Sequence, residues 1–390
     1  MPPGGLPRRS LLTRRHVGAR RGARRGARGP GRGARWLGSA TGVGNTTRAS
    51  VVGPTMTVPL SILDLAPIAP GETARDSFAA SVALAQQAEA SGYRRVWYAE
   101  HHNMSSIASS ATSVLIAHVA SQTSTIRLGS GGVMLPNHSP LTIAEQFGTL
   151  ETLHPGRIDL GLGRAPGSDQ ATFRALRRDP ASSERFPQDV LELQAFLAGE
   201  SRVPGVSATP GAGTAVPLYI LGSSLFGAQL AAALGLPYAF ASHFAPDALH
   251  QAVATYRREF QPSAQLDQPY VLAGVNAIAS DDADDAQRQF AEMKRARLMM
   301  LLRQSGQVTV DRTFSDDELD HLLRTPAGGH VASMTTYTGV GTGDEVADYV
   351  SRFADSADAD EVIVAHASLR TSDRLRSVAL LAESTARVPA

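Results

Sequence analysis

The chain alternates between short apolar runs and longer amphipathic stretches from residue 58 almost to its end. Short apolar runs bounded by turn residues are typical of buried strands, and apolar residues at helical spacing are typical of helices. This pattern predicts eight strands, at residues 59–66, 95–99, 126–135, 157–163, 216–221, 237–241, 270–279 and 361–365.

Each predicted strand is followed by a predicted helix. The helices fall at residues 73–90, 109–121, 142–153, 184–199, 225–234, 245–260, 281–302, 345–355 and 373–381, while residues 303–340 break the rhythm. Strands that alternate with helices indicate a parallel sheet. Eight units over about 330 residues indicate a (β/α)8 TIM barrel with insertions rather than an open doubly wound sheet. Ligands of such a barrel bind at the carboxyl ends of the strands.

The third predicted strand contains two adjacent glycines, Gly131 and Gly132, close to its carboxyl end. Glycine inside a strand marks a bulge or a place where another group approaches the backbone closely. Two explanations fit this pair. It is either a bend of the barrel without a ligand, or a side-chain-free patch against which a flat ring lies.

The composition of the chain excludes several kinds of site and of protein. The chain has 390 residues, 43% of them hydrophobic, which is enough for one large core. It contains no cysteine, which excludes disulfides, thiolate metal sites and a cysteine nucleophile. No apolar run reaches the length of a transmembrane helix. We therefore expect a cytoplasmic protein without a membrane partner.

The charge is distributed unevenly. Residues 1–55 hold twelve Arg and no acidic residue, so the remainder carries a net charge of −11 although the whole chain carries +1. The Arg/Gly-rich segment cannot bury a core, and we expect it to be a disordered extension. Three explanations of the segment compete, namely a nucleic-acid-binding arm, a targeting peptide and translated upstream DNA. Our hypothesis is the last, with Met56 as the true start, and we expect one domain over residues 56–390. The acidic body offers no basic face for nucleic acid.

The second predicted strand is followed by Glu100-His101-His102-Asn103. Adjacent histidines on an extended chain point to opposite sides, and the chain has no H-x-x-x-H or H-x-H pattern. We therefore predict no metal site. A polar loop is one alternative. The other is an acid or base at the barrel mouth, since the ordinary pKa of histidine, ~6.5, suits either role.

Two later segments contain groups that bind anions. Arg164 follows the fourth strand in a G-x-G-x-x-x-G context that does not match the dinucleotide fingerprint, so we interpret it as a phosphate clamp. Ser223 and Ser224 lead into a helix, where free backbone N–H groups bind anions. A surface ion pair for Arg164 and a ligand-free N-cap for Ser223 are the alternatives. Together the two segments would hold a phosphorylated flat cofactor.

The sequence resembles the bacterial luciferase-like monooxygenases, in particular their alkanal-monooxygenase-like branch, over about residues 58–385. The segments that carry the resemblance are residues 96–104, 128–138, 144–146 and 155–167. The resemblance implies reduced FMN at the strand ends, supplied by a separate NAD(P)H:flavin reductase, because no NAD(P)H-binding motif is visible. It also implies O2 addition to a C4a-(hydro)peroxyflavin, oxygen transfer to a small organic substrate, and a homodimer formed through the helix at 109–121.

The resemblance also assigns residues. It implies a non-proline cis peptide at Gly131–Gly132 behind the flavin ring, a catalytic acid/base at His101, and a phosphate contact at Arg164 and Ser223. The remaining site residues are assigned by position, Ala66 and Ser224 to the cofactor and Asn137, His138 and His243 to the substrate pocket.

Two departures from luciferase concern the flavin site. Gly163 stands where luciferase has a cysteine, and Gly222 stands where it has a glutamate, so light emission is not implied. Residues 303–340 are a candidate lid over the site. Two other functions remain open, namely hydride transfer with the deazaflavin F420 and flavin binding without turnover.

Overall fold

A computed structural model describes residues 58–165, 170–309 and 312–386. These residues belong to one compact unit, Val52–Ala390. The Arg-rich extension predicted for residues 1–55, the proposed start at Met56 and part of the loop after Arg164 lie outside the described residues.

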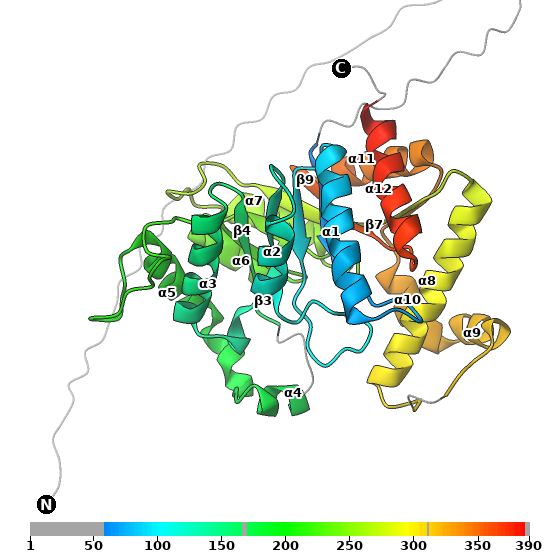
Figure 1. The fold of residues 1–390 in the computed structure, drawn as a ribbon, viewed down its shortest axis with the longest axis horizontal. Helices are drawn as coiled ribbons and strands as arrows, with labels where there is room; N and C mark the ends of the chain where they lie inside the picture. The colour runs from blue at the N-terminus through cyan, green and yellow to red at the C-terminus, as the bar shows by residue number, and fades with distance from the viewer. Residues whose placement is uncertain (1–57, 166–169, 310–311, 387–390) are drawn as a thin grey trace, which may run out of the picture. The chain divides into compact units, whose positions relative to one another are not determined.

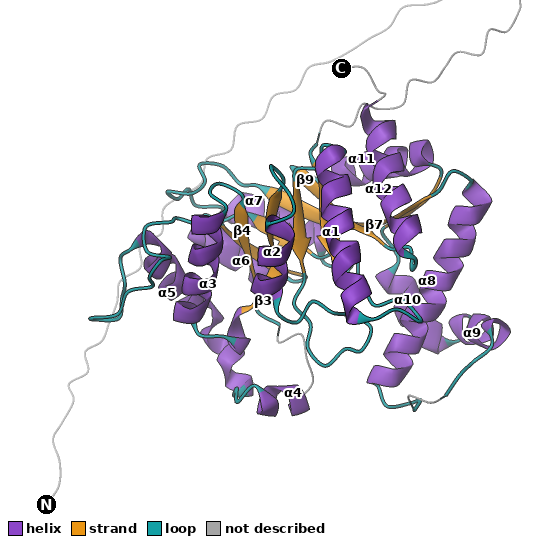
Figure 2. Ribbon diagram, in the orientation of Figure 1, coloured by secondary structure: helices purple, strands orange, loops and turns teal. Residues whose placement is uncertain are grey.

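Eight parallel strands close into a TIM barrel, as predicted (Figures 1 and 2). Each strand pairs with the next along the chain, and the ring closes through pairing of β9 with both β7 and β1. The barrel strands are β1 Leu60–Asp64, β2 Arg95–Tyr98, β3 Arg127–Met134, β4 Ile158–Gly163, β5 Leu218–Gly222, β6 Tyr238–Phe240, β7 Val271–Ala279 and β9 Glu361–His366.

A ninth strand, β8 Thr338–Gly341, was not predicted. It pairs with the end of β7, from Asn276 opposite Thr338 to Ala279 opposite Gly341. The pairing is available because the three-residue strand β6 follows β7 only as far as Ala273, which leaves the later residues of β7 free on that edge. The four-residue strand contains two glycines, so it carries little strand signal of its own.

Helices surround the barrel (Figure 1). They are α1 Ala74–Ala90, α2 Thr112–Ala120, α3 Pro140–Leu153, α4 Gln170–Ala175, α5 Phe186–Ala198, α6 Leu225–Leu234, α7 Leu249–Glu259, α8 Ala283–Gln304, α9 Asp316–Leu323, α10 Pro326–Met334, α11 Gly343–Ala357 and α12 Thr371–Ala386, with short 3-10 turns at Leu135–Asn137 and Pro180–Arg185. Several begin at side-chain caps, such as the reciprocal pair of Thr73 and Asp76 at α1. Among the described helices, none combines the length and apolarity needed to cross a bilayer.

Residues 303–340 contain α9, α10 and most of β8. Both helices pack on α8 through a small apolar cluster that includes Leu298, Leu319 and Val331. Arg295 of α8 adds ion pairs of 2.7 Å to Asp316 and to Asp320. The segment predicted as a lid is therefore an ordered helical insertion on α8, and its movement remains a prediction.

The barrel interior has an apolar middle and a charged amino end. Trp97 is fully buried and belongs to an apolar cluster with residues of five other strands, including Leu63, Tyr219 and Ile363, which places these side chains inside the barrel. Below them, Arg95, which is 1% exposed, forms ion pairs with Asp159 (2.8 Å) and Glu361 (2.9 Å).

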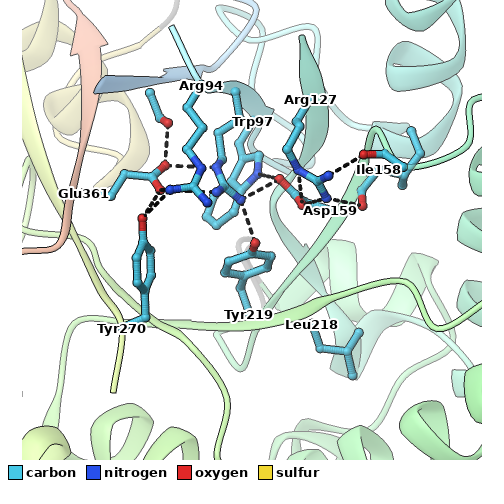
Figure 3. A network of polar contacts seen from close by, with 12 residues as sticks. Arg94, Trp97, Arg127, Ile158, Asp159, Leu218, Tyr219, Tyr270 and Glu361 are labelled. Carbon is cyan, nitrogen blue, oxygen red and sulfur yellow. Dashed lines mark hydrogen bonds and ion pairs between the residues drawn. The ribbon is translucent and has the colours of Figure 1, made fainter. Parts of the chain in front are cut away.

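Further donors complete this charged network (Figure 3). Asp159 also accepts hydrogen bonds from Arg127 (3.1 Å) and from the indole N–H of Trp97 (3.1 Å), while Glu361 accepts one from Tyr270 (2.8 Å). Arg95 and Glu361 are the first residues of their strands, so the network lies at the end of the barrel opposite the strand carboxyl ends. We infer that it stabilises the fold.

Candidate active site

The predicted site residues follow the carboxyl ends of neighbouring strands. His101 follows β2, His138 follows β3, Arg164 follows β4 and Ser223 follows β5. Because the strands are parallel and adjacent in the ring, their carboxyl ends meet at one end of the barrel, which we call the carboxyl rim.

A buried carboxylate, Glu100, organises the loops after β2 and β3. Glu100 is 1% exposed and accepts hydrogen bonds from His102 Nε2 (2.8 Å) and His138 Nε2 (2.9 Å). The backbone N–H of Met134 donates to the same carboxylate at 3.1 Å, and the side-chain amide of Asn137 donates at 3.4 Å. One side chain therefore fixes both loops, and the sequence analysis assigned it no role.

The electrostatics of Glu100 follow from these donors. Burial by itself would raise the pKa of Glu100, but the hydrogen bonds from His102 and His138 lower that pKa to about 2. The hydrogen bond to Glu100 in turn raises the pKa of His102, against the opposing effect of burial. The carboxylate is thus ionised at neutral pH and favours a protonated His102.

His101 lies in a different environment from its neighbour. Burial lowers the pKa of His101, while the charge of Glu100 opposes this shift and that of His102 adds to it. Its Nδ1 atom is buried and has no hydrogen-bond partner. Two adjacent histidines thus have pKa values shifted in opposite directions, an arrangement that separates acid and base roles. The lowered pKa favours the neutral form of His101, and its Nδ1 atom is unused by the described residues.

His243, after β6, offers a second imidazole nitrogen without a partner. Its Nδ1 atom is buried, and its pKa is lowered to about 3 by burial, with smaller contributions from Arg297 and His101. The ring packs on Gly274 of β7, where a Cβ atom would lie 2.5 Å from Nδ1. The influence of His101 on this pKa shows that both rings lie in the same part of the rim.

Two polar residues that support His243 were not identified from the sequence alone. Asn276 donates from Nδ2 to the His243 carbonyl at 2.6 Å, and Arg297 of α8 donates to Asn276 Oδ1 at 2.9 Å. The available signal was Asn276 itself, a polar residue in the otherwise apolar strand β7, together with Gly274 in the same strand. Polar residues inside a buried strand require hydrogen-bond partners, so they point to a site.

The structure places the glycine pair at a register shift between β3 and β4, as the bulge interpretation predicted, and the Gly131–Gly132 peptide bond is cis. A Cβ at Gly132 would lie 2.8 Å from the carbonyl oxygen of Gly161, and one at Gly131 would lie 2.8 Å from Cδ1 of Leu63. The glycines are therefore needed for close packing of protein on protein. A ring would lie against the backbone of this segment and not in the space left by their missing side chains.

The groups predicted to bind phosphate do come together. The guanidinium of Arg164 lies 4.1 Å from the ring centroid of Phe226 in the first turn of α6. Ser223 and Ser224 are both exposed beside this turn. The N-cap of α6 is Ser224 rather than Ser223, and its side chain makes no capping hydrogen bond. A cation, two hydroxyls and the free N–H groups of a helix start thus lie together at this corner, and anion binding there remains a prediction.

Two other predicted residues are enclosed by protein. Ala66 is fully buried with a left-handed φ of 46°, and its N–H donates to Asp64 Oδ1 at 2.9 Å. Asn137 is also buried, and its carbonyl accepts a hydrogen bond from Arg178 at 3.1 Å. Their contacts with ligands remain predictions. Within the described ranges, no three His, Asp or Glu side chains are grouped as a metal would require.

This geometry can be compared with known proteins. The luciferase-like monooxygenase family matches residues 58–360. The chain belongs to this family. It is 56% identical over 253 residues to a luciferase-like monooxygenase of Escherichia coli (strain K12), a match that covers 65% of this chain and 76% of the relative. The family consists of oxidoreductases, which agrees with the predicted class of function.

Solved structures give the same result for the fold. The crystal structure of apo-MsnO8 is 36% identical, with a TM-score of 0.75 over 86% of this chain and all of its own. Two structures share the fold at lower identity. The oxygenating constituent of 3,6-diketocamphane monooxygenase from Pseudomonas putida, in complex with FMN, is 17% identical (TM-score 0.61, 85% and 99% covered). An F420-dependent tetrahydromethanopterin reductase from Methanopyrus kandleri is 18% identical (TM-score 0.60, 84% and 98% covered).

Acid should weaken the contribution of Glu100 to stability. A carboxyl group whose pKa falls from 4.5 to about 2 on folding stabilises the protein above pH 4.5, and this stabilisation is lost as the pH falls towards 2. The loss should amount to about 3 kcal/mol at most. Urea unfolding across this range should show a difference between wild type and Glu100→Gln that shrinks with falling pH. If the difference in stability between wild type and Glu100→Gln stayed constant with pH, Glu100 would not be stabilised in its ionised form by folding.

Proposed function

We propose that the protein is a monooxygenase that uses reduced FMN and O2 to oxygenate a small organic substrate. The observation that carries this proposal is the neutral His101, whose buried Nδ1 atom has no protein partner, at the same rim as the corner formed by Arg164 and α6. Family membership supports the same class of reaction.

The residues of the rim fit FMN. Arg164, Ser223, Ser224 and the first turn of α6 would hold the phosphate, since a guanidinium and helix N–H groups both favour phosphate oxygens. The backbone of β3 at Gly131–Gly132 would support the ring. When bound and reduced, the flavin supplies the electrons that activate O2.

The protein's own groups would control protons and water. His101 is neutral at physiological pH, because burial lowers its pKa, so it would accept a proton from the substrate or cofactor and return it in the same cycle. His102 and His138 are held by Glu100, while Asn137 and His243 would line the substrate pocket with His138. A buried site also excludes water, which protects a reactive oxygen species from breakdown.

Two partners belong to the same proposal. A separate reductase would supply reduced FMN. A second copy of the chain would pack against α2, where the side chain of Val114 is 68% exposed. Sedimentation velocity at several protein concentrations would distinguish a dimer from a monomer.

A second candidate cofactor is F420, which shares with FMN the need for a phosphate site and is the cofactor of a reductase with this fold. Titration of the purified protein with oxidised FMN, reduced FMN and F420 would separate the two, because the chromophores differ in absorbance. Reduced FMN should bind and yield oxygenated product with a panel of aldehydes, ketones and aromatics. Tight binding of F420 with hydride transfer would replace the proposal, and flavin binding without any turnover would leave a binding protein.

Arg164→Gln should weaken FMN binding about ten- to a hundredfold, because hydrogen bonds to a charged group contribute about 1.5–3 kcal/mol. The FMN affinity of Arg164→Lys should lie between those of Arg164→Gln and wild type, since lysine keeps the positive charge but lacks the planar guanidinium group. Fluorescence titration with FMN gives the affinities. Arg202→Gln, an exposed arginine in the loop before β5, is the matched control. Equal affinities for all four proteins would place the phosphate elsewhere.

A further inference from the structure

A second buried arginine, Arg374 in the first turns of α12, differs from Arg95 in its surroundings. Both are almost fully enclosed, at 4% and 1% exposure. Arg95 is neutralised by Asp159 and Glu361, whereas no carboxylate in the described part of the chain forms an ion pair with Arg374. A buried charge without a counter-charge is strongly unfavourable, so this contrast points to a missing anion.

The donors around Arg374 are largely unused. Its Nη2 atom donates to Thr371 Oγ1 at 3.2 Å, but its Nε and Nη1 atoms are buried without hydrogen-bond partners. The hydroxyl of Ser368, a residue that is 2% exposed in the loop between β9 and α12, also has none. Buried polar atoms of folded proteins are nearly always paired, so three such atoms within seven residues of chain are unusual.

Acidic groups on α12 and at the start of α8 are engaged with other residues. Asp281 forms an ion pair with Arg376 at 2.5 Å, and Asp285 accepts a hydrogen bond from Ser280 at 2.6 Å. The Asp373 carboxylate accepts a hydrogen bond from its neighbour Ser372 at 3.0 Å. None of these contacts supplies a counter-charge to Arg374.

The position of Arg374 on its helix adds a second positive feature. The hydrogen bond to Thr371 shows that the guanidinium reaches back to the first residue of α12, a 16-residue helix that packs beside α1 and α11 (Figure 1). The N–H groups of a helix's first turn lack intrahelical acceptors, and the helix dipole makes this end positive. Guanidinium and helix end therefore favour the same ligand, an anion.

We propose that Arg374, Ser368 and the amino end of α12 form a binding site for one small anion, of the size of chloride or a single carboxylate group. The site is separate from the phosphate corner at Arg164. In the ring of strands, β9 lies four strands from β4 in either direction, so the two guanidinium groups follow strands on opposite sides of the barrel. An inorganic ion and the carboxylate of an organic molecule share the required chemistry.

Thermal unfolding at constant ionic strength tests the site. The melting temperature of wild type should rise and saturate with added chloride or acetate, because a ligand that binds only the folded state stabilises it. Arg376→Gln, a change to an exposed arginine on the same helix, should respond like wild type. In Arg374→Met the melting temperature should no longer rise with added anion. In Ser368→Ala the same rise should require a higher anion concentration. Equal responses of wild type and Arg374→Met would overturn the site.

A direct measurement covers the case in which Arg374→Met does not fold. Crystals of wild type grown with bromide should show an anomalous peak beside Arg374 and Ser368, and the absence of that peak would overturn the proposal. The source of the anion follows from a series of carboxylates. Affinity that increases from acetate to hexanoate indicates an organic ligand, whereas a preference for chloride over all carboxylates indicates an inorganic ion.

Discussion

Replacing Asp159 with asparagine is expected to lower the free energy of unfolding by about 3–5 kcal/mol. Asp159 is fully buried and accepts hydrogen bonds from Arg95 (2.8 Å), Arg127 (3.1 Å) and Trp97 (3.1 Å). An amide keeps the size of the side chain but removes its charge. Of the two carboxylates that now pair with Arg95, only Glu361 would remain, and Arg127 would lose its ion pair with Asp159. The amino end of the barrel would then hold an uncompensated positive charge.

Urea unfolding followed by circular dichroism would measure this loss. Asp281→Asn is the matched control, because Asp281 forms an exposed ion pair with Arg376, and exposed pairs contribute little to stability. If both substitutions lowered stability equally, the network at the amino end of the barrel would not be a principal stabilising feature.

His101→Ala is expected to reduce coupled oxygenation at least tenfold, equivalent to about 1.4 kcal/mol of barrier. The variant removes the neutral imidazole whose Nδ1 atom has no protein partner, while the phosphate corner at Arg164 stays intact. Reduced FMN should therefore bind with unchanged affinity. Product formed per reduced FMN consumed is the quantity to measure.

A matched control for this variant is His321→Ala, an exposed histidine on α9. It should keep both flavin affinity and product yield. Unchanged yield in His101→Ala would remove His101 from the mechanism, whereas loss of flavin binding would show that the residue serves the cofactor site instead.

The barrel could be predicted because its signals are local. Strand β7, from Val271 to Ala279, is a nearly unbroken apolar run, and α1 is preceded by the capping residue Thr73. Burial of every strand on both faces requires such runs in a parallel barrel. All eight barrel strands were placed for this reason, whereas the short β8 depends on the edge of β7 beyond the end of β6, which is visible only after folding.

The residues of the candidate site could be named in part from the sequence, and their roles remain predictions. His101, Arg164 and the serines before α6 stand at strand ends, and their types suit proton transfer and phosphate binding. The partners of these residues come from distant parts of the chain, so no local pattern reports them. Glu100 with His138, and Asn276 with His243, are such pairs.

The sequence by itself determined the period of strands and helices, and with it the end of the barrel at which ligands of this fold bind. The tertiary structure decided the directions in which the pKa values of His101, His102 and His243 shift, and which buried arginine has a counter-charge. The physical reason is that pKa values and counter-charges depend on burial and on neighbours that chain closure brings together. Arg95 and Arg374 are the same residue type, yet only Arg95 meets two carboxylates, one of them 266 positions away.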